Sequence, residues 1–300
     1  MGRALWPNAM GTSRRAFLLA AAALSACVRS PRAADPIAGP RDGIDGIERR
    51  VGGRVGVAAL DTATGARIGH REGERFAMCS TFKWLLVACV LRQVDRGALA
   101  LDRSIAFGPS DLLDYSDVTR AHATDGAMTV VALCDAALEV SDNTAANLLL
   151  REIGGPSAYT AFARSLGDRA TRLDRGEPGL NLNGRGDPRD TTTPAAMLAT
   201  MQRVLAGDAL SPASRARLID AMKRCRTGTH RLRAGFPSRW VVAHKTGTGE
   251  RGASGDLAIA WPPGRAPVLV ASYTSDSGAD LDALDAAHAS VARFVARALG

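Results

Sequence analysis

The chain has 300 residues, of which 46% are hydrophobic, so it is long and apolar enough to bury the core of one large domain or two interlocked ones. Its formal net charge is +8, but five arginines precede Asp35 in a segment that we expect to be removed. The remainder is only modestly basic, has three tyrosines and shows no cluster of aromatic and basic residues, which disfavours nucleic-acid binding.

Residues 1–34 have the features of an export signal. They lack acidic residues and carry a twin arginine at 14–15, followed by an apolar run too short to span a bilayer comfortably. Two processing schemes fit this segment. Residues 24–27 resemble a lipobox, in which Cys27 would be lipidated and attach the protein to the membrane, whereas cleavage near Ala34 would release a soluble protein. Both schemes predict a periplasmic protein exported by the twin-arginine route.

The mature chain begins and ends with strand patterns. A hairpin is predicted from two short apolar segments around a turn at 61–65, and three further strands are predicted near the C-terminus. Because short turns join them, we expect a five-stranded antiparallel sheet, covered by two amphipathic helices. The predicted strands are 55–60, 66–70, 240–244, 256–261 and 268–273, and the helices are 44–51 and 281–299.

The middle of the chain is helical in pattern. Helices are predicted at 81–95, 129–139 and 143–153, and two more begin at the capping pairs Thr193-Pro194 and Ser211-Pro212. Residues 172–190 lack periodicity, and a loop of this length in a compact protein is usually functional. The pattern therefore predicts a two-domain α/β fold with its site in a cleft between the halves. The sheet domain would comprise 35–75 and 224–300, and an all-α domain, 76–223, would include the long loop.

Only three of the 38 basic residues are lysines, and two of them lie in short polar motifs, Ser80-x-x-Lys83 and Lys245-Thr246-Gly247. A buried lysine can lose its proton and act as a base, which an arginine cannot do. Because Lys83 follows Ser80 by one helical turn, the first motif predicts a serine nucleophile activated by a lysine. Lys245 needs only to be a compact cation.

Four motifs occur in the order and approximate spacing of the class A β-lactamases, and the chain resembles this family over essentially its whole mature length. The motifs are Ser80-x-x-Lys83, Ser141-Asp142-Asn143, Glu177-Pro178-x-Leu180-Asn181 and Lys245-Thr246-Gly247. The resemblance implies the fold of serine β-lactamases and penicillin-binding proteins, a five-stranded antiparallel sheet with flanking helices and an inserted all-α domain. It also implies a monomer that needs no cofactor and confers antibiotic resistance by hydrolysing the β-lactam amide of penicillins and cephalosporins.

The resemblance implies specific catalytic roles. Ser80 would form the acyl-enzyme, and the backbone N–H groups of Ser80 and Thr248 would form the oxyanion hole. Ser141 would carry a proton to the leaving nitrogen. Glu177, held by Asn181, would activate the water that hydrolyses the acyl-enzyme. Whether Lys83 or Glu177 is the base in acylation stays open at this stage.

The resemblance also implies substrate-binding and structural roles. Asn143 would bind the acylamido side chain of the substrate, with a helix N-cap as its alternative role. Tyr115 would form a wall of the cleft, the alternative being an ordinary exposed loop residue. Arg175 and Asp190 would close the long loop, unless they are unrelated solvated charges. The substrate carboxylate would be bound by Lys245, Thr246, Gly247, Thr248 and Arg231. The alternative for Arg231 is a surface charge at the end of a helix.

Two other functions are compatible with some of the same motifs. A penicillin-binding D,D-peptidase or a β-lactam sensor would share the Ser-x-x-Lys motif but would not need the pair Glu177 and Asn181. A non-catalytic lipoprotein that binds cell-wall peptides would need no base for deacylation. A metal-dependent enzyme is disfavoured because the five histidines are scattered, and the wide spacing of the cysteines disfavours a zinc site. Export would permit disulfides, but the sequence does not pair the four cysteines of the mature chain.

Overall fold

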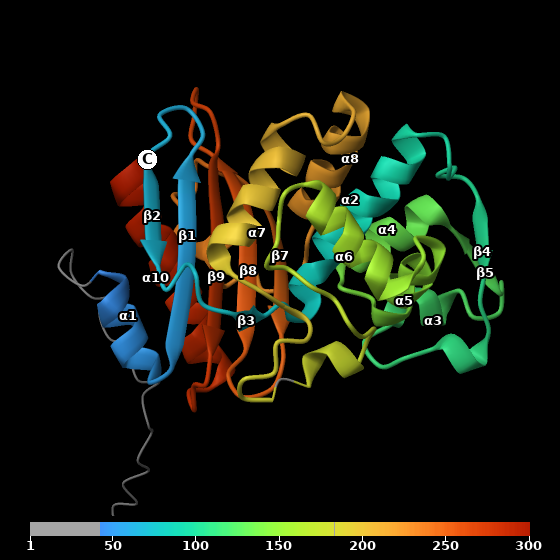
Figure 1. Cartoon of the computed structure of the whole chain (residues 1–300), viewed down its shortest axis with the longest axis horizontal. Coiled ribbons are helices and arrows are strands. Elements are labelled where there is room, and N and C mark those ends of the chain that lie inside the picture. Colours follow the sequence, from blue (N-terminus) through green and yellow to red (C-terminus); the bar gives the residue numbers. More distant parts are fainter. Residues whose placement is uncertain (1–42, 183) are drawn as a thin grey trace, which may run out of the picture. The chain divides into compact units, whose positions relative to one another are not determined.

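Five strands form one antiparallel sheet in the order β2-β1-β9-β8-β7 (Figure 1). The computed structural model describes residues 43–182 and 184–300; the predicted export signal, with Cys27, lies outside them. The strands are β1 (Arg54–Asp61), β2 (Arg67–His70), β7 (Val241–Thr248), β8 (Ser254–Trp261) and β9 (Val268–Ser275). The predicted sheet is confirmed, with one difference that matters. Strand β7 does not end at His244 but continues to Thr248, so the whole Lys-Thr-Gly motif is held in the sheet.

Both faces of the sheet are covered. Along β1, Val57 and Ala59 pack on one side, while Ala58 and Leu60 pack on the other, as the alternation of side chains in a strand requires. Because neither face meets water, nearly every residue of β1 is buried, which explains its continuous apolar sequence. The helices against the first face are α1 (Ile44–Val51), α9 (Leu232–Gly235) and α10 (Leu281–Leu299).

The opposite face packs against the helical part of the chain. In Figure 1, α7 crosses the sheet, and most of the other helices of this part lie to the right of β7. The central element of the helical part is α2, in which every residue from 82 to 91 is buried, as expected of a helix that is apolar all round. The predicted starts of two helices are confirmed: Thr193 caps α7 and Ser211 caps α8. The helices of this part are α2 (Phe82–Asp95), α3 (Asp117–Ala121), α4 (Val130–Glu139), α5 (Asn143–Glu152), α6 (Gly155–Ser165), α7 (Pro194–Met201) and α8 (Pro212–Lys223).

Two short strand pairs were not predicted. β3 (Phe76–Ala77) pairs with β6 (Thr191–Thr192), and β4 (Ser104–Ala106) pairs with β5 (Ala127–Thr129). Strands of two or three residues are too short to show an alternating pattern in a sequence. The predicted domain boundaries stay a prediction, because one apolar cluster runs from the sheet into the helical part. Within residues 43–182 and 184–300, no helix is long and apolar enough to cross a bilayer.

Candidate active site

Ser80 lies in a single turn, η1 (Cys79–Thr81), directly before α2. Strand β7 passes so close to this turn that a Cβ atom on Gly247 would come within 2.8 Å of the Ser80 nitrogen. A glycine is therefore needed for the strand to approach the serine, and the residue after it is Thr248. The two N–H groups implied for the oxyanion hole, those of Ser80 and Thr248, thus belong to the two segments that meet at this point.

Lys83 is fully buried and its ammonium group faces the other polar side chains of the site. Its Nζ atom lies 3.0 Å from Oγ of Ser80 and 2.9 Å from Oε1 of Glu177. It also donates to Oδ1 of Asn143 at 2.6 Å and to the carbonyl of Ser141 at 2.8 Å. A lysine that extended along the helix to solvent would make none of these contacts.

The Glu177 side chain is likewise buried, on the long loop opposite α2. The Ser80 hydroxyl donates to its Oε1 at 3.1 Å, and Nδ2 of Asn181 donates to its Oε2 at 2.6 Å. The other side-chain atom of that asparagine, Oδ1, is buried and makes no hydrogen bond among the described residues. Glu177 and Asn181 therefore present a carboxylate and a spare acceptor beside the serine.

Ser141 connects the two lysines. Its Oγ accepts from Nζ of Lys245 at 3.1 Å and lies 3.3 Å from Nζ of Lys83. Lys245 is fully buried, and it also donates to the carbonyl of Thr246 at 2.8 Å. A hydroxyl held between two amines is well placed to pass a proton.

Burial is the largest effect on both amines. It lowers the pKa of Lys83, although the Glu177 carboxylate acts in the opposite direction. It also lowers the pKa of Lys245 to about 8; the Cys225 thiol acts against this change, while the charge of Lys83 adds to it. Burial therefore acts on the pKa of Lys83 in the direction that a base beside Ser80 requires.

Asn143 does not cap its helix. Asp142 is the N-cap of α5, and its carboxylate accepts from the backbone N–H of Ala145 at 2.9 Å. The Oδ1 atom of Asn143 therefore accepts from Lys83, and its Nδ2 atom donates to the carbonyl of Asp114 at 3.0 Å. The alternative role predicted for Asn143 is wrong, and the asparagine is part of the buried polar cluster.

Tyr115 is held by its backbone, not by its ring. Its carbonyl accepts from the Asn143 N–H at 3.0 Å, and its side chain is 85% exposed. Its φ angle of 55° is left-handed, as are those of Cys79 (44°) and Ser141 (63°). Such conformations cost about 1–3 kcal/mol each and persist where the surrounding structure enforces them, often at functional sites.

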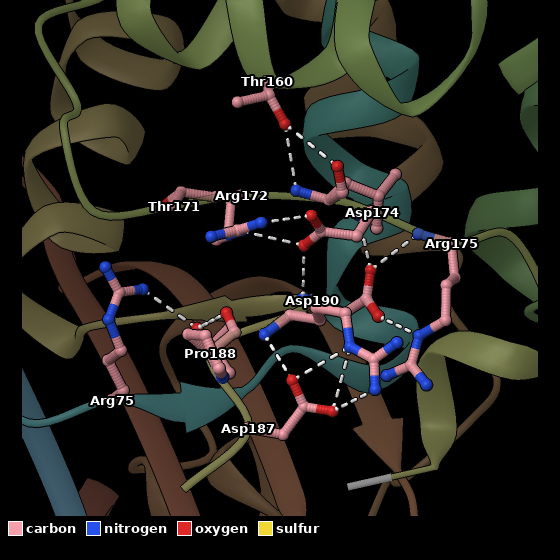
Figure 2. A network of polar contacts seen from close by, with 12 residues as sticks. Arg75, Thr160, Thr171, Arg172, Asp174, Arg175, Asp187, Pro188 and Asp190 are labelled. Carbon is pink, nitrogen blue, oxygen red and sulfur yellow. Dashed lines mark hydrogen bonds and ion pairs between the residues drawn. The ribbon is translucent and has the colours of Figure 1, made fainter.

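The long loop is anchored at its two ends through Asp190, as Figure 2 shows. The fully buried Asp190 carboxylate accepts from Nε of Arg175 at 2.6 Å. It also accepts from the backbone N–H groups of Asp174 at 2.7 Å and of Arg175 at 2.9 Å. The alternative of two unrelated solvated charges is therefore wrong, and this pair closes the loop that carries Glu177.

Arg231 is buried, with 3% of its surface exposed, so it is not a helix-end surface charge. Its guanidinium donates to the Asp285 carboxylate at 2.6 Å and to the Gly247 carbonyl at 2.7 Å. A third donor, Nη2, reaches Oγ1 of Thr248 at 2.7 Å. The structure therefore places Arg231 behind the exposed Thr248, one of the residues implied to bind the carboxylate.

Asn147 was missed by sequence reasoning. It lies one turn after Asn143 on α5, its Oδ1 accepts from the Glu177 N–H at 2.9 Å, and its Nδ2 donates to the Glu177 carbonyl at 2.9 Å. The side chain thus fixes the backbone of the glutamate from both sides. The signal was available, because residues four apart on a helix lie on the same face.

The comparisons with known proteins agree with this geometry. The model of the β-lactamase enzyme family matches residues 40–299. The chain belongs to the class A β-lactamase family. Among its relatives, β-lactamase L2 of Stenotrophomonas maltophilia is 48% identical over 85% of this chain and 84% of that protein. The carbapenem-hydrolysing β-lactamase KPC of Klebsiella oxytoca is 44% identical over 85% of this chain and 87% of that one.

Solved structures of class A β-lactamases show the same fold. An ancestral class A β-lactamase of Gram-negative bacteria is 58% identical, with a TM-score of 0.84 over 85% of this chain and 98% of that chain. The putative class A β-lactamase PenP from Rhodopseudomonas palustris is 52% identical, with a TM-score of 0.83 over 85% of this chain and 97% of that one. The chain is therefore an antibiotic-hydrolysing serine β-lactamase with the fold of this family.

Proposed function

We propose that this enzyme hydrolyses penicillins and cephalosporins through an acyl-enzyme on Ser80, which a water activated by Glu177 then releases. One observation carries the proposal. The Glu177 carboxylate lies in a single buried cluster with the nucleophile and with Lys83, at 3.1 Å and 2.9 Å respectively. A protein that only formed an acyl-enzyme, with Lys83 as its base, would not need a carboxylate at this position.

In acylation, Oγ of Ser80 attacks the carbonyl carbon of the lactam, and the carbon–nitrogen bond of the ring breaks. The proton of the hydroxyl goes to Lys83 or to Glu177, both of which lie within hydrogen-bond reach. Ser141, which contacts both amines, passes a proton to the leaving nitrogen. The N–H groups of Ser80 and Thr248 stabilise the negative oxygen, and losing one such donor costs about 10²–10³ in rate.

In deacylation, a water beside Glu177 and Asn181 attacks the ester carbonyl. Glu177 takes the proton of this water, and the spare Oδ1 acceptor of Asn181 orients it. The ester bond to Ser80 breaks, the serine recovers its proton, and the product leaves as an open-ring acid. Lys245, Thr246 and Thr248 hold the substrate carboxylate during both steps.

The test is to mix the purified protein with a chromogenic cephalosporin. Continuous turnover supports the proposal. A burst equal to the enzyme concentration supports a sensor or a D,D-peptidase, and the absence of any covalent adduct supports a non-catalytic binder.

The loop anchor gives a first prediction. Asp190→Ala removes the partner of Arg175 and leaves two backbone N–H groups unpaired. Breaking such a buried pair costs about 3 kcal/mol of unfolding free energy, so the loop loosens and deacylation slows before acylation does. Single-turnover kinetics and thermal unfolding measure both effects. The control is Asp187→Ala, which removes the carboxylate of a partly exposed ion pair with Arg189 in the same loop and should change the deacylation rate and the stability much less. An unchanged deacylation rate together with unchanged stability in Asp190→Ala would contradict the prediction.

Arg231 gives a second prediction. Arg231→Ala removes the guanidinium that holds Thr248 and the strand beside it, so we expect the KM for penicillins to rise about tenfold, in line with the loss of a hydrogen bond to a charged group. Arg239→Ala deletes the same charge from an exposed position just before β7, away from Thr248 at the end of that strand, and should leave the KM unchanged. If the two variants had equal KM values, the carboxylate site would not depend on Arg231.

We also propose that the protein is a periplasmic monomer exported through residues 1–34 by the twin-arginine route, with Cys27 as the site of lipidation. The twin arginine and the lipobox-like motif support this proposal. Fractionation of cells that express the full chain or its Cys27→Ala variant tests it. A lipoprotein moves from the membrane to the soluble fraction on substitution, whereas an unchanged distribution favours cleavage near Ala34.

A further inference from the structure

Two threonines of β7, Thr246 and Thr248, contact the segment that joins α8 to α9. They are two residues apart in a strand, so their side chains project from the same face. The resemblance to class A β-lactamases implies that both bind the substrate carboxylate. Residues 227–231 of the joining segment are called the supporting segment below.

The supporting segment meets the strand at two points. Oγ1 of Thr227 lies 2.6 Å from Oγ1 of Thr246. Further along, Nη2 of Arg231 donates to Oγ1 of Thr248 at 2.7 Å. Between these points, a Cβ atom on Gly228 would come within 2.5 Å of Cγ2 of Thr246, and the φ angle of Gly228, 58°, is left-handed. A glycine is therefore needed for the segment to approach the strand this closely.

At Thr248 the chemistry of the partner fixes the direction of the hydrogen bond. A guanidinium donates and cannot accept, so the Thr248 hydroxyl accepts from Arg231 and keeps its own proton for another partner. A carboxylate, in contrast, only accepts. The arrangement therefore suits a hydroxyl that donates to the carboxylate of a substrate.

At Thr246 two directions are possible, because each hydroxyl of the pair can donate or accept. If Thr246 donated to Thr227, its oxygen would face the carboxylate with lone pairs alone, and the two groups would repel. If Thr227 donates, the proton of Thr246 is available to the carboxylate, as it is at Thr248. Only this second direction gives both threonines of the strand the same role.

A second group competes for the proton of Thr227. Sγ of Cys225 lies 3.4 Å from Oγ1 of Thr227, and either atom can be the donor. A thiol that donates to Thr227 supports the direction given above, whereas a thiolate would draw the proton toward sulfur. Burial acts to raise the pKa of this thiol, but His244 and the charge of Lys245 lower it to about 6, so the competition has to be tested.

We propose that Thr227 orients the hydroxyl of Thr246 by donating to it, so that Thr246 donates to the carboxylate of the bound substrate. Thr227 is a positioning residue, because it acts through Thr246. Arg231 has the same relation to Thr248, so the supporting segment prepares two neighbouring hydroxyls for one anion. The inference rests on the proposed function, since it concerns the carboxylate subsite of that reaction.

The first experiment is a double-mutant cycle in which the KM and kcat for a penicillin are measured. Thr227→Val keeps the shape of the side chain and removes its hydroxyl, so we expect the KM to rise about fivefold, as for the loss of one hydrogen bond between neutral groups, while kcat changes less. Thr246→Val also raises the KM. In the double variant, Thr227→Val should add nothing, because it acts only through Thr246. An equal rise with and without the Thr246 hydroxyl overturns the proposal.

Three further variants separate orientation from packing. Thr227→Ser restores the hydroxyl and should restore the KM. Cys225→Ala removes the competing sulfur and should change the KM little; a clear fall would show that sulfur takes the Thr227 proton in the wild type, which contradicts the proposal. Thr62→Val is the control, because it removes a hydroxyl that donates to the Pro267 carbonyl at 2.7 Å, directly after β1, and should leave the KM unchanged.

A measurement without substrate keeps the inference apart from the proposed function. Thermal unfolding of the variants of the cycle gives the coupling between Thr227 and Thr246, and we expect their losses of stability to be non-additive. Additive losses would overturn the inference, even if the wild type hydrolyses penicillins. A wild type that did not turn over the penicillin would refute the proposed function, and the unfolding cycle would still test the pair.

Discussion

Glu177→Gln should give an enzyme that is acylated and then stops. A glutamine has nearly the same shape but cannot take a proton, and a general base typically contributes about 10²–10⁴ in rate. With a chromogenic cephalosporin we therefore expect a burst equal to the enzyme concentration, followed by turnover slower by about that factor. Stopped-flow absorbance separates the two phases.

The same experiment assigns the base for acylation. If Lys83 takes the proton from Ser80, the burst in Glu177→Gln is as fast as in wild type; if Glu177 takes it, the burst is slowed as well. Glu250→Gln makes the same change at an exposed position on the turn after β7, and it should behave as wild type. Steady turnover by Glu177→Gln at the wild-type rate would contradict the role given to this carboxylate.

Lys83→Arg should abolish the burst itself. The substitution keeps the positive charge but removes a group that can lose its proton, and it places the larger guanidinium group in a fully buried site. The Nζ atom contacts four side chains or carbonyls within 3.0 Å, and a planar guanidinium cannot reproduce that geometry. We expect acylation to slow by about 10²–10⁴, measured as the rate of covalent labelling by a penicillin.

The chain supplies its own control for this change. Its third lysine, Lys223, lies at the exposed end of α8 and pairs with Asp220 at 3.1 Å. Lys223→Arg should leave acylation unchanged, because an exposed ion pair needs only a positive charge. Equal labelling rates in the two variants would mean that Lys83 serves as a charge and not as a base or a proton relay.

Much of the fold was predictable because its signals are local. The helix α10 has the predicted bounds, and Thr193 and Ser211 begin helices as their capping patterns indicate. The end of β7 was not predictable in the same way. Lys245, Thr246 and Gly247 interrupt its apolar pattern, and only pairing with β8 keeps them in the strand.

The site was predictable in its motifs and not in its supporting contacts. Ser80, Lys83 and Glu177 stand in recognisable motifs, whereas Arg231 and Asn147 act through partners that only the folded chain brings together. His244 illustrates the limit, because its partner Asp256 lies on the neighbouring strand β8.

The central claim, that Ser80 carries an acyl group which Glu177 removes, is tested most directly by mass spectrometry of wild type and Glu177→Gln after mixing with a penicillin. We predict that the variant retains an adduct with the mass of the intact penicillin and that digestion places it on the peptide 76–83, while wild type returns to its unmodified mass. An adduct located elsewhere, or one that persists equally long in both proteins, would contradict the account.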